Sequence, residues 1–126
     1  MKIVIIEDEE DLGVLMRNFL MNQFKSISPN TEVKIAHTLS EGKDCIDSLK
    51  PDWVFLDNNL PDGKGINEIV CIRSTSVSEK VTIVMMSAMT NLKEEALSKG
   101  ADYFLDKPIS FAAVSQIISR QNPIDF

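Results

Sequence analysis

The stretch WVFLDNNLPDGKG, residues 53–65, decides the fold class because an apolar run ends abruptly on an acid. Four apolar residues precede Asp57, and one proline and two glycines follow it. A strand this apolar needs cover on both faces, as in a parallel sheet. An isolated buried carboxylate is very costly, so the acid at its end must be solvated, paired or bound to a cation. The stretch therefore predicts a buried strand that carries a functional acid to one edge of a sheet.

Strand and helix patterns alternate on both sides of this stretch. We expect strands at residues 3–6, 31–37, 53–56, 81–86 and 103–105. The first and third are apolar throughout and the fourth is apolar apart from Thr82, whereas the second alternates apolar and polar residues and the fifth is short. The second and fifth strands are therefore expected at the edges, which gives the order 2-1-3-4-5. With five intervening helices, the pattern predicts an α/β fold with a doubly wound, flavodoxin-like parallel sheet.

The five helices are expected from apolar spacing and from residues that begin or end helices. A capping box at Thr38 opens the second helix, and Pro51 ends it. Gly100 is expected to stop the fourth helix, and Ser110 to cap the fifth, which ends at Asn122-Pro123. The residues expected to face inward are Leu12, Leu15, Met16, Phe19, Leu20, Leu39, Ile46, Leu49, Ile66, Ile69, Val70, Leu92, Ala96, Leu97, Phe111, Val114, Ile117 and Ile118.

Composition limits the possible functions. The 126 residues are 44% hydrophobic and carry a formal net charge of −6, which argues against a stand-alone nucleic-acid-binding protein. No apolar run approaches the length of a membrane span, and the N-terminus lacks a signal-peptide pattern. We therefore expect a single domain over residues 1–126, located in the cytoplasm. Cys45 and Cys71 lack metal or disulfide spacing and are expected to be buried, while the lone His37 is expected at a strand end.

Polar residues follow each strand near the point where the strand order reverses, which is where such sheets bind ligands. Glu7 and Asp8 follow the first strand, Asp57 the third, Ser87 the fourth and Lys107 the fifth. The three carboxylates should meet in one cleft and repel one another unless a cation intervenes. An all-oxygen pocket with few protein ligands suits Mg²⁺. The ion and Lys107 together would roughly neutralise the three acids.

A neutralised acidic cleft can accept a phosphoryl group, because phosphoryl transfer needs a nucleophile and positive charge around the transferred oxygens. Asp57, central and singly placed, is the predicted nucleophile and would form an acyl phosphate. Asp8 would bind the metal, with Glu7 acting directly or through water, and the loop Asn58-Asn59 would offer a backbone carbonyl. The Ser87 hydroxyl and Lys107 ammonium would hold phosphoryl oxygens.

Together these residues resemble the response-regulator receiver domain, the phosphoacceptor of two-component signalling. The resemblance rests on Glu7-Asp8, on Asp57 in LDNNLPDGKG, on Ser87 in VMMSA and on Lys107-Pro108 in DYFLDKP. It implies that Asp57 receives its phosphoryl group from a sensor histidine kinase or a histidine phosphotransfer protein. It also implies Mg²⁺ held by Asp8, Asp57 and the carbonyl of Asn59, with Glu7 in the outer shell. Such a domain catalyses its own phosphorylation and dephosphorylation without being an enzyme in the usual sense.

The resemblance further implies a switch in which Ser87 and Phe104 move on phosphorylation. The surface of the fourth helix, fifth strand and fifth helix would then bind a downstream protein or an output domain, with a cis peptide bond before Pro108. Two departures stand out: Glu7 replaces the commoner aspartate, and Phe104 lacks the hydroxyl of many relatives.

Other readings of the sequence remain. The domain is either a complete regulator or the N-terminal part of a longer DNA-binding regulator, and a pseudo-receiver that binds partners without phosphorylation is an alternative. A flavodoxin-like electron carrier is disfavoured, because the acidic loop of residues 7–11 would repel a flavin phosphate. An aspartate-dependent phosphohydrolase usually has a DxD pattern after one strand, and the first strand has none.

Overall fold

The computed structural model describes residues 1–75 and 81–121 and contains the predicted five-stranded parallel sheet. Its strands are β1 (Lys2–Ile6), β2 (Glu32–Ala36), β3 (Trp53–Asp57), β6 (Thr82–Ser87) and β7 (Tyr103–Asp106). They lie in the order β2-β1-β3-β6-β7, all parallel, which confirms the order predicted from strand hydropathy. A short antiparallel hairpin, β4 (Asn59–Leu60) and β5 (Gly63–Lys64), was not predicted.

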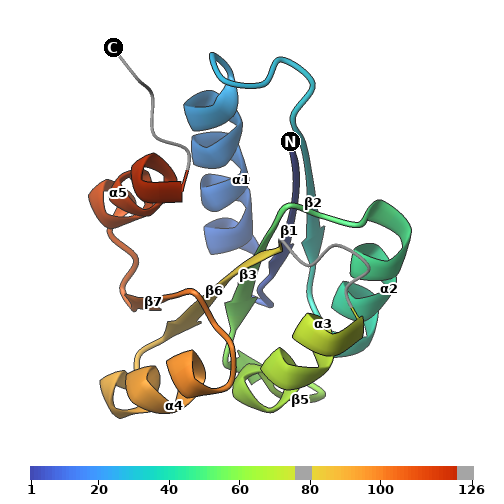
Figure 1. The fold of residues 1–126 in the computed structure, drawn as a ribbon, viewed down its shortest axis with the longest axis vertical. Coiled ribbons are helices and arrows are strands. Elements are labelled where there is room, and N and C mark those ends of the chain that lie inside the picture. Colours follow the sequence, from blue (N-terminus) through green and yellow to red (C-terminus); the bar gives the residue numbers. More distant parts are fainter. Residues whose placement is uncertain (76–80, 122–126) are drawn as a thin grey trace.

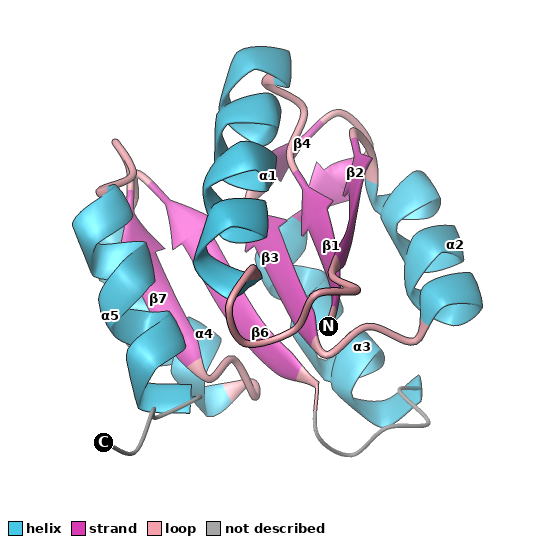
Figure 2. Cartoon of the chain, turned by 90° about the horizontal axis from the view of Figure 1, so that it is seen from above, coloured by secondary structure: helices cyan, strands magenta, loops and turns pink. Residues whose placement is uncertain are grey.

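Helices cover both faces of the sheet (Figures 1 and 2). One face carries α1 (Glu10–Phe24) and α5 (Phe111–Gln121). The other carries α2 (Leu39–Leu49), α3 (Ile69–Thr75) and α4 (Lys93–Ser98). Short 3₁₀ turns at Gly65–Glu68 and Thr90–Leu92 precede α3 and α4. The end of α5 expected at Asn122-Pro123 lies outside the described residues.

Strand residues supply two cores because successive side chains point to opposite faces. In β1, Ile3 and Ile5 pack under α1 and α5, whereas Val4 and Ile6 pack under α2, α3 and α4. Trp53 stacks on Phe55 with ring centroids 5.7 Å apart, within the core beneath α1. Each fully buried aliphatic or aromatic side chain contributes about 1.5–3 kcal/mol of transfer free energy. The cores hold the strands in register and so fix where their carboxyl ends lie.

The predicted caps at Thr38, Gly100 and Ser110 are confirmed, although the Glu41 side chain expected to complete a capping box accepts its hydrogen bond from the His37 N–H and not from the Thr38 N–H. The Thr38 Oγ1 accepts a hydrogen bond from the Glu41 N–H at 3.0 Å, and the Ser110 Oγ accepts one from the Ala113 N–H at 3.3 Å. Gly100 follows α4 with a φ of +115°, a backbone conformation that favours glycine. The peptide bond between Lys107 and Pro108 is cis, as the resemblance implied.

Several predictions of burial were wrong. Leu15, Val70 and Leu97 were expected to face inward, yet they are 55%, 56% and 39% exposed. Each lies beside a buried neighbour, namely Met16, Ile69 or Ala96, and successive helix residues point about 100° apart, so in these three pairs the neighbour faces the sheet. In α1, the buried stripe consists of Gly13, Met16, Leu20 and Phe24. Cys71 is exposed and Cys45 is half-buried, so the expectation that both are buried was also wrong.

None of the helices within residues 1–75 and 81–121 is both long and apolar enough to cross a membrane.

Candidate functional site

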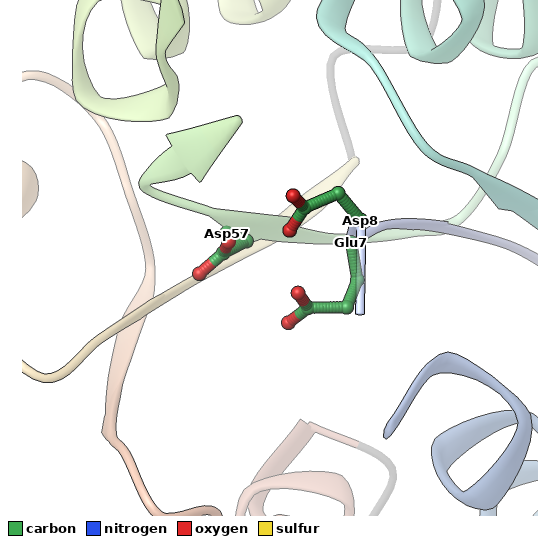
Figure 3. Close-up of side chains that lie close together, drawn as sticks. All are labelled: Glu7, Asp8 and Asp57. Carbon is green, nitrogen blue, oxygen red and sulfur yellow. The ribbon is translucent and has the colours of Figure 1, made fainter. Parts of the chain in front are cut away.

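Three carboxylates meet where β1 and β3 end side by side. Glu7 and Asp8 follow β1, and Asp57 is the last residue of β3 (Figure 3). Each can offer one oxygen such that all three oxygens lie within 4.8 Å of one another. Glu7 and Asp57 are almost completely buried, at 0% and 2% exposure, whereas Asp8 is exposed. Adjacent parallel strands thus bring together the acids that the sequence predicted to converge.

Lys107 enters the same site from the loop after β7. Its Nζ lies 2.8 Å from Glu7 Oε1 and 3.0 Å from Asp57 Oδ1. The Lys107 N–H donates to the Ser87 carbonyl at 3.0 Å, which fixes the start of the loop against the end of β6. The ammonium group therefore bridges the acids of two different strands and compensates part of their charge.

Burial dominates the protonation of this cluster. Burial raises the pKa of Glu7 above its ordinary value, and the hydrogen bond from Lys107 only partly opposes this effect. Burial likewise raises the pKa of Asp57, against the hydrogen bond and charge of Lys107, while the nearby Asp8 raises it further. Burial lowers the pKa of Lys107, but its two carboxylate partners outweigh burial and the pKa is raised overall. Both buried acids would therefore gain from an additional cation.

Ser87 and Phe104 lie on the same face of the sheet. Ser87, the last residue of β6, is 1% exposed, and its Oγ accepts a hydrogen bond from the Met89 N–H at 3.0 Å. Asp57 is paired in register with Met86, so Ser87 stands one residue beyond it on the neighbouring strand. Phe104 pairs with Met85, two residues before Ser87, and packs partly buried against the core beneath α4.

The chain after Asp57 is held in a tight hairpin. Asn58 is 3% exposed, and its Oδ1 accepts a hydrogen bond from the Ile66 N–H at 3.1 Å, while its carbonyl accepts one from the Gly65 N–H at 2.9 Å. A Cβ at Gly65 would lie 2.2 Å from the Asp57 carbonyl oxygen, so only glycine permits this approach. Asn59 is exposed, and its Oδ1 accepts a hydrogen bond from Lys64 Nζ at 2.8 Å.

The sequence predicts only a backbone carbonyl from the Asn58-Asn59 loop, whereas in the structure the Asn58 side chain closes the hairpin. The available signal was an amide placed directly after a buried strand, where an unpaired polar group would be costly.

The donor set fits Mg²⁺. Carboxylate oxygens are the hard ligands that this ion prefers, and a site with few protein ligands leaves room for the waters it retains. Two of the acids are buried with raised pKa values, so a divalent cation would relieve their mutual repulsion. Of the predicted metal ligands, the structure brings Glu7, Asp8 and Asp57 together.

Comparison with known proteins agrees with this geometry. Residues 3–119 match the family model described as the response regulator receiver domain, so the chain belongs to this family. It is 26% identical over 118 residues to the transcriptional regulatory protein DpiA of Escherichia coli K12, covering 94% of this chain and 50% of DpiA. It also superimposes with a TM-score of 0.84 on the crystal structure of the signal receiver domain of a DNA-binding response regulator from Colwellia psychrerythraea 34H. That structure is 27% identical, and the match covers 95% of this chain and 96% of that one.

Relatives of this family differ in what accompanies the receiver domain. A protein-glutamate methylesterase/protein-glutamine glutaminase of Vibrio cholerae is 34% identical over 115 residues, which cover 86% of this chain and 29% of that protein. The chain thus spans half or less of the length of both curated relatives. Family membership establishes a receiver domain of the kind found in two-component response regulators.

Proposed function

We propose that the chain is a phosphoacceptor in which Asp57 receives a phosphoryl group from a phosphohistidine on a sensor kinase or a histidine phosphotransfer protein. The contact of Lys107 with both Glu7 and Asp57 is the observation that carries this proposal. It places a cation beside a buried carboxylate at the end of a central strand, which is where a transferred phosphoryl group would need positive charge.

The proposed reaction is a direct displacement at phosphorus. An Asp57 oxygen forms a bond to phosphorus as the bond to the histidine nitrogen breaks, and the released imidazole regains a proton from solvent. Lys107 would move from its contact with Asp57 to a phosphoryl oxygen, and the Ser87 hydroxyl would donate to another.

When bound, Mg²⁺ would neutralise charge on the transferred group. Asp8, Asp57 and the Asn59 carbonyl would hold it, with Glu7 in the outer shell. Hydrolysis of the acyl phosphate by water would reset the domain.

We infer that phosphorylation is read at the surface formed by α4, β7 and α5. Ser87 and Phe104 share one sheet face, so a movement of the Ser87 hydroxyl toward the phosphoryl group would free space beside Phe104. The receiving partner would be a downstream protein or an output domain of a longer chain. The lack of surplus basic charge disfavours direct nucleic-acid binding by this domain. Because the phosphoryl group comes from a kinase that uses ATP, we place the reaction in the cytoplasm.

Intact-mass spectrometry tests the proposal. The protein is incubated with acetyl phosphate, with Mg²⁺ or with a chelator. We expect the mass of one phosphoryl group to be gained only with Mg²⁺, and none to be gained by Asp57→Asn. Asp52→Asn is a matched control, since this exposed acid precedes β3 and its Oδ2 accepts a hydrogen bond from the Lys2 N–H at 2.8 Å.

Equal labelling of Asp57→Asn and the wild type would show that the nucleophile is a different residue. A wild-type protein that gains no phosphoryl group yet still binds its partner would favour the alternative, a pseudo-receiver that works without phosphorylation. The complete set of site residues argues against that alternative.

A further inference from the structure

The side chain of Asp62 connects the β4–β5 hairpin, which follows Asp57, to helix α2 through hydrogen bonds. Asp62 lies in the turn between β4 and β5. Its Oδ1 accepts a hydrogen bond from the Leu39 N–H at 2.8 Å, and its Oδ2 accepts one from the Ser40 N–H at 3.0 Å. Each carboxylate oxygen therefore binds one of the first two backbone donors of α2. The two bonds lower the pKa of Asp62, as expected for a carboxylate held in its charged form.

Helix α2 needs this outside help at only two of its donors. The first four N–H groups of a helix have no partner within it. In α2, the Glu41 N–H donates to Thr38 Oγ1 at 3.0 Å, and the first bond of the helix itself runs from the Gly42 N–H to the Thr38 carbonyl at 2.9 Å. Asp62, more than twenty residues away in sequence, accepts hydrogen bonds from the Leu39 and Ser40 N–H groups. The start of α2 is thus completed by the loop that follows the proposed phosphorylated residue.

The same helix start is bonded to the acidic loop after β1. The Glu41 Oε1 accepts a hydrogen bond from the His37 N–H at 2.9 Å. The His37 Nδ1 lies 3.0 Å from the Glu7 carbonyl oxygen, and the Glu7 N–H donates to the Ala36 carbonyl at 2.9 Å. A chain of hydrogen bonds therefore runs from the hairpin after Asp57, across the start of α2, to the backbone of Glu7. It joins the two halves of the candidate metal site.

We propose that Asp62 is a positioning residue that sets the hairpin after Asp57 relative to the Glu7-Asp8 loop and so pre-forms the Mg²⁺ site. This inference rests on the proposed function. Without Asp62, the hairpin stays joined to β3 through Asn58 and keeps the Leu39 side chain beside Gly63, but it loses both hydrogen bonds to α2. The ion would then have to draw the two loops together, and its affinity would fall. The catalytic groups themselves would be unchanged, so any loss in the rate of phosphorylation should disappear when Mg²⁺ is saturating.

The test measures the Mg²⁺ dissociation constant by calorimetry for the wild type, Asp62→Ala and Asp62→Asn. Residues that support metal ligands from outside typically change affinity or activity 10–100-fold, so we expect Asp62→Ala to bind Mg²⁺ about 10-fold more weakly. Asn retains one acceptor oxygen, so Asp62→Asn should lie between it and the wild type. Lys50 is the only non-glycine residue of the described chain with a positive φ, so Ala can adopt the backbone at Asp62.

Asp52→Ala serves as the matched control, because it also removes an exposed carboxylate bound to a backbone N–H, but at the opposite end of β3. Acetyl phosphate labelling then separates positioning from stability: Asp62→Ala should need more Mg²⁺ yet reach the wild-type rate at saturation. A wild-type Mg²⁺ affinity in Asp62→Ala would overturn the inference but not the proposed function. Equal losses of Mg²⁺ affinity in Asp62→Ala and Asp52→Ala would have the same consequence. Absence of Mg²⁺ binding in the wild type would overturn the proposed function together with the inference.

Discussion

Replacing Lys107 by Met removes the ammonium group that contacts two buried carboxylates while keeping a long side chain. Breaking a buried ion pair by removing one partner costs about 3–5 kcal/mol. The Lys107 side chain retains 21% exposure, so water already screens part of the interaction. We therefore expect the free energy of unfolding to fall by roughly 2–3 kcal/mol at neutral pH in the absence of Mg²⁺. For a domain of this size, the melting temperature should drop by about 10 °C.

The pH dependence of this loss follows from the raised pKa values of Glu7 and Asp57. A carboxyl group whose pKa is higher in the folded state binds more protons when folded, so its contribution to stability falls as pH rises from the ordinary value through the raised one. Removing Lys107 takes away the hydrogen bonds that oppose this rise. The difference in free energy of unfolding between Lys107→Met and the wild type should thus be largest near about pH 8 and shrink toward about pH 5.

Urea unfolding followed by circular dichroism, in the presence of a chelator and at both pH values, measures this difference. Lys99→Met is the control, because Lys99, directly after α4, pairs with the exposed Glu95 at 2.9 Å, and such an i,i+4 pair is worth about 0.3–0.5 kcal/mol. A Lys107→Met protein as stable as the wild type at neutral pH would refute the reasoning. A loss of the same size at both pH values would show that packing, rather than charge, accounts for it.

Three further substitutions test how the site is held. Gly65→Ala would place a Cβ 2.2 Å from the Asp57 carbonyl oxygen, so we expect a loss of about 1–3 kcal/mol in urea unfolding and slower acetyl phosphate labelling. Arg73→Ala removes hydrogen bonds to two backbone carbonyls and a carboxylate near the amino ends of β6 and β7, and should cost about 2–3 kcal/mol without changing labelling at low temperature. Thr38→Ala removes the acceptor for the Glu41 N–H, and its urea midpoint should fall by an amount equivalent to about 1 kcal/mol.

The sheet could be predicted from the sequence because apolar content distinguishes interior strands from edges. The uninterrupted apolar runs around Val4, Phe55 and Val84 can be satisfied only where both faces are covered. The alternation in residues 31–37 and the shortness of residues 103–105 leave the edges for those strands. Once the order is set, the acids after neighbouring strands must converge, which is why the order of residues alone was enough to group Glu7, Asp8 and Asp57.

The parts that were missed depend on contacts distant in sequence. Asp62 reads as an ordinary turn residue, and only the folded chain shows that it caps α2. Asn58 reads as a loop residue, and its buried bond to Ile66 depends on how the hairpin closes. Apolar periodicity also overestimated burial at Leu15 and Val70, because it cannot decide which of two adjacent apolar residues faces the sheet.

The most direct test of the central claim is a crystal structure of the protein grown with Mn²⁺, a cation with similar ligand preferences to Mg²⁺ that scatters anomalously. We expect one anomalous peak at the carboxyl ends of β1 and β3, within bonding distance of carboxylate oxygens of Asp8 and Asp57, with Lys107 still beside Asp57. The absence of a peak there at saturating Mn²⁺, or an ion bound by other residues, would contradict the account.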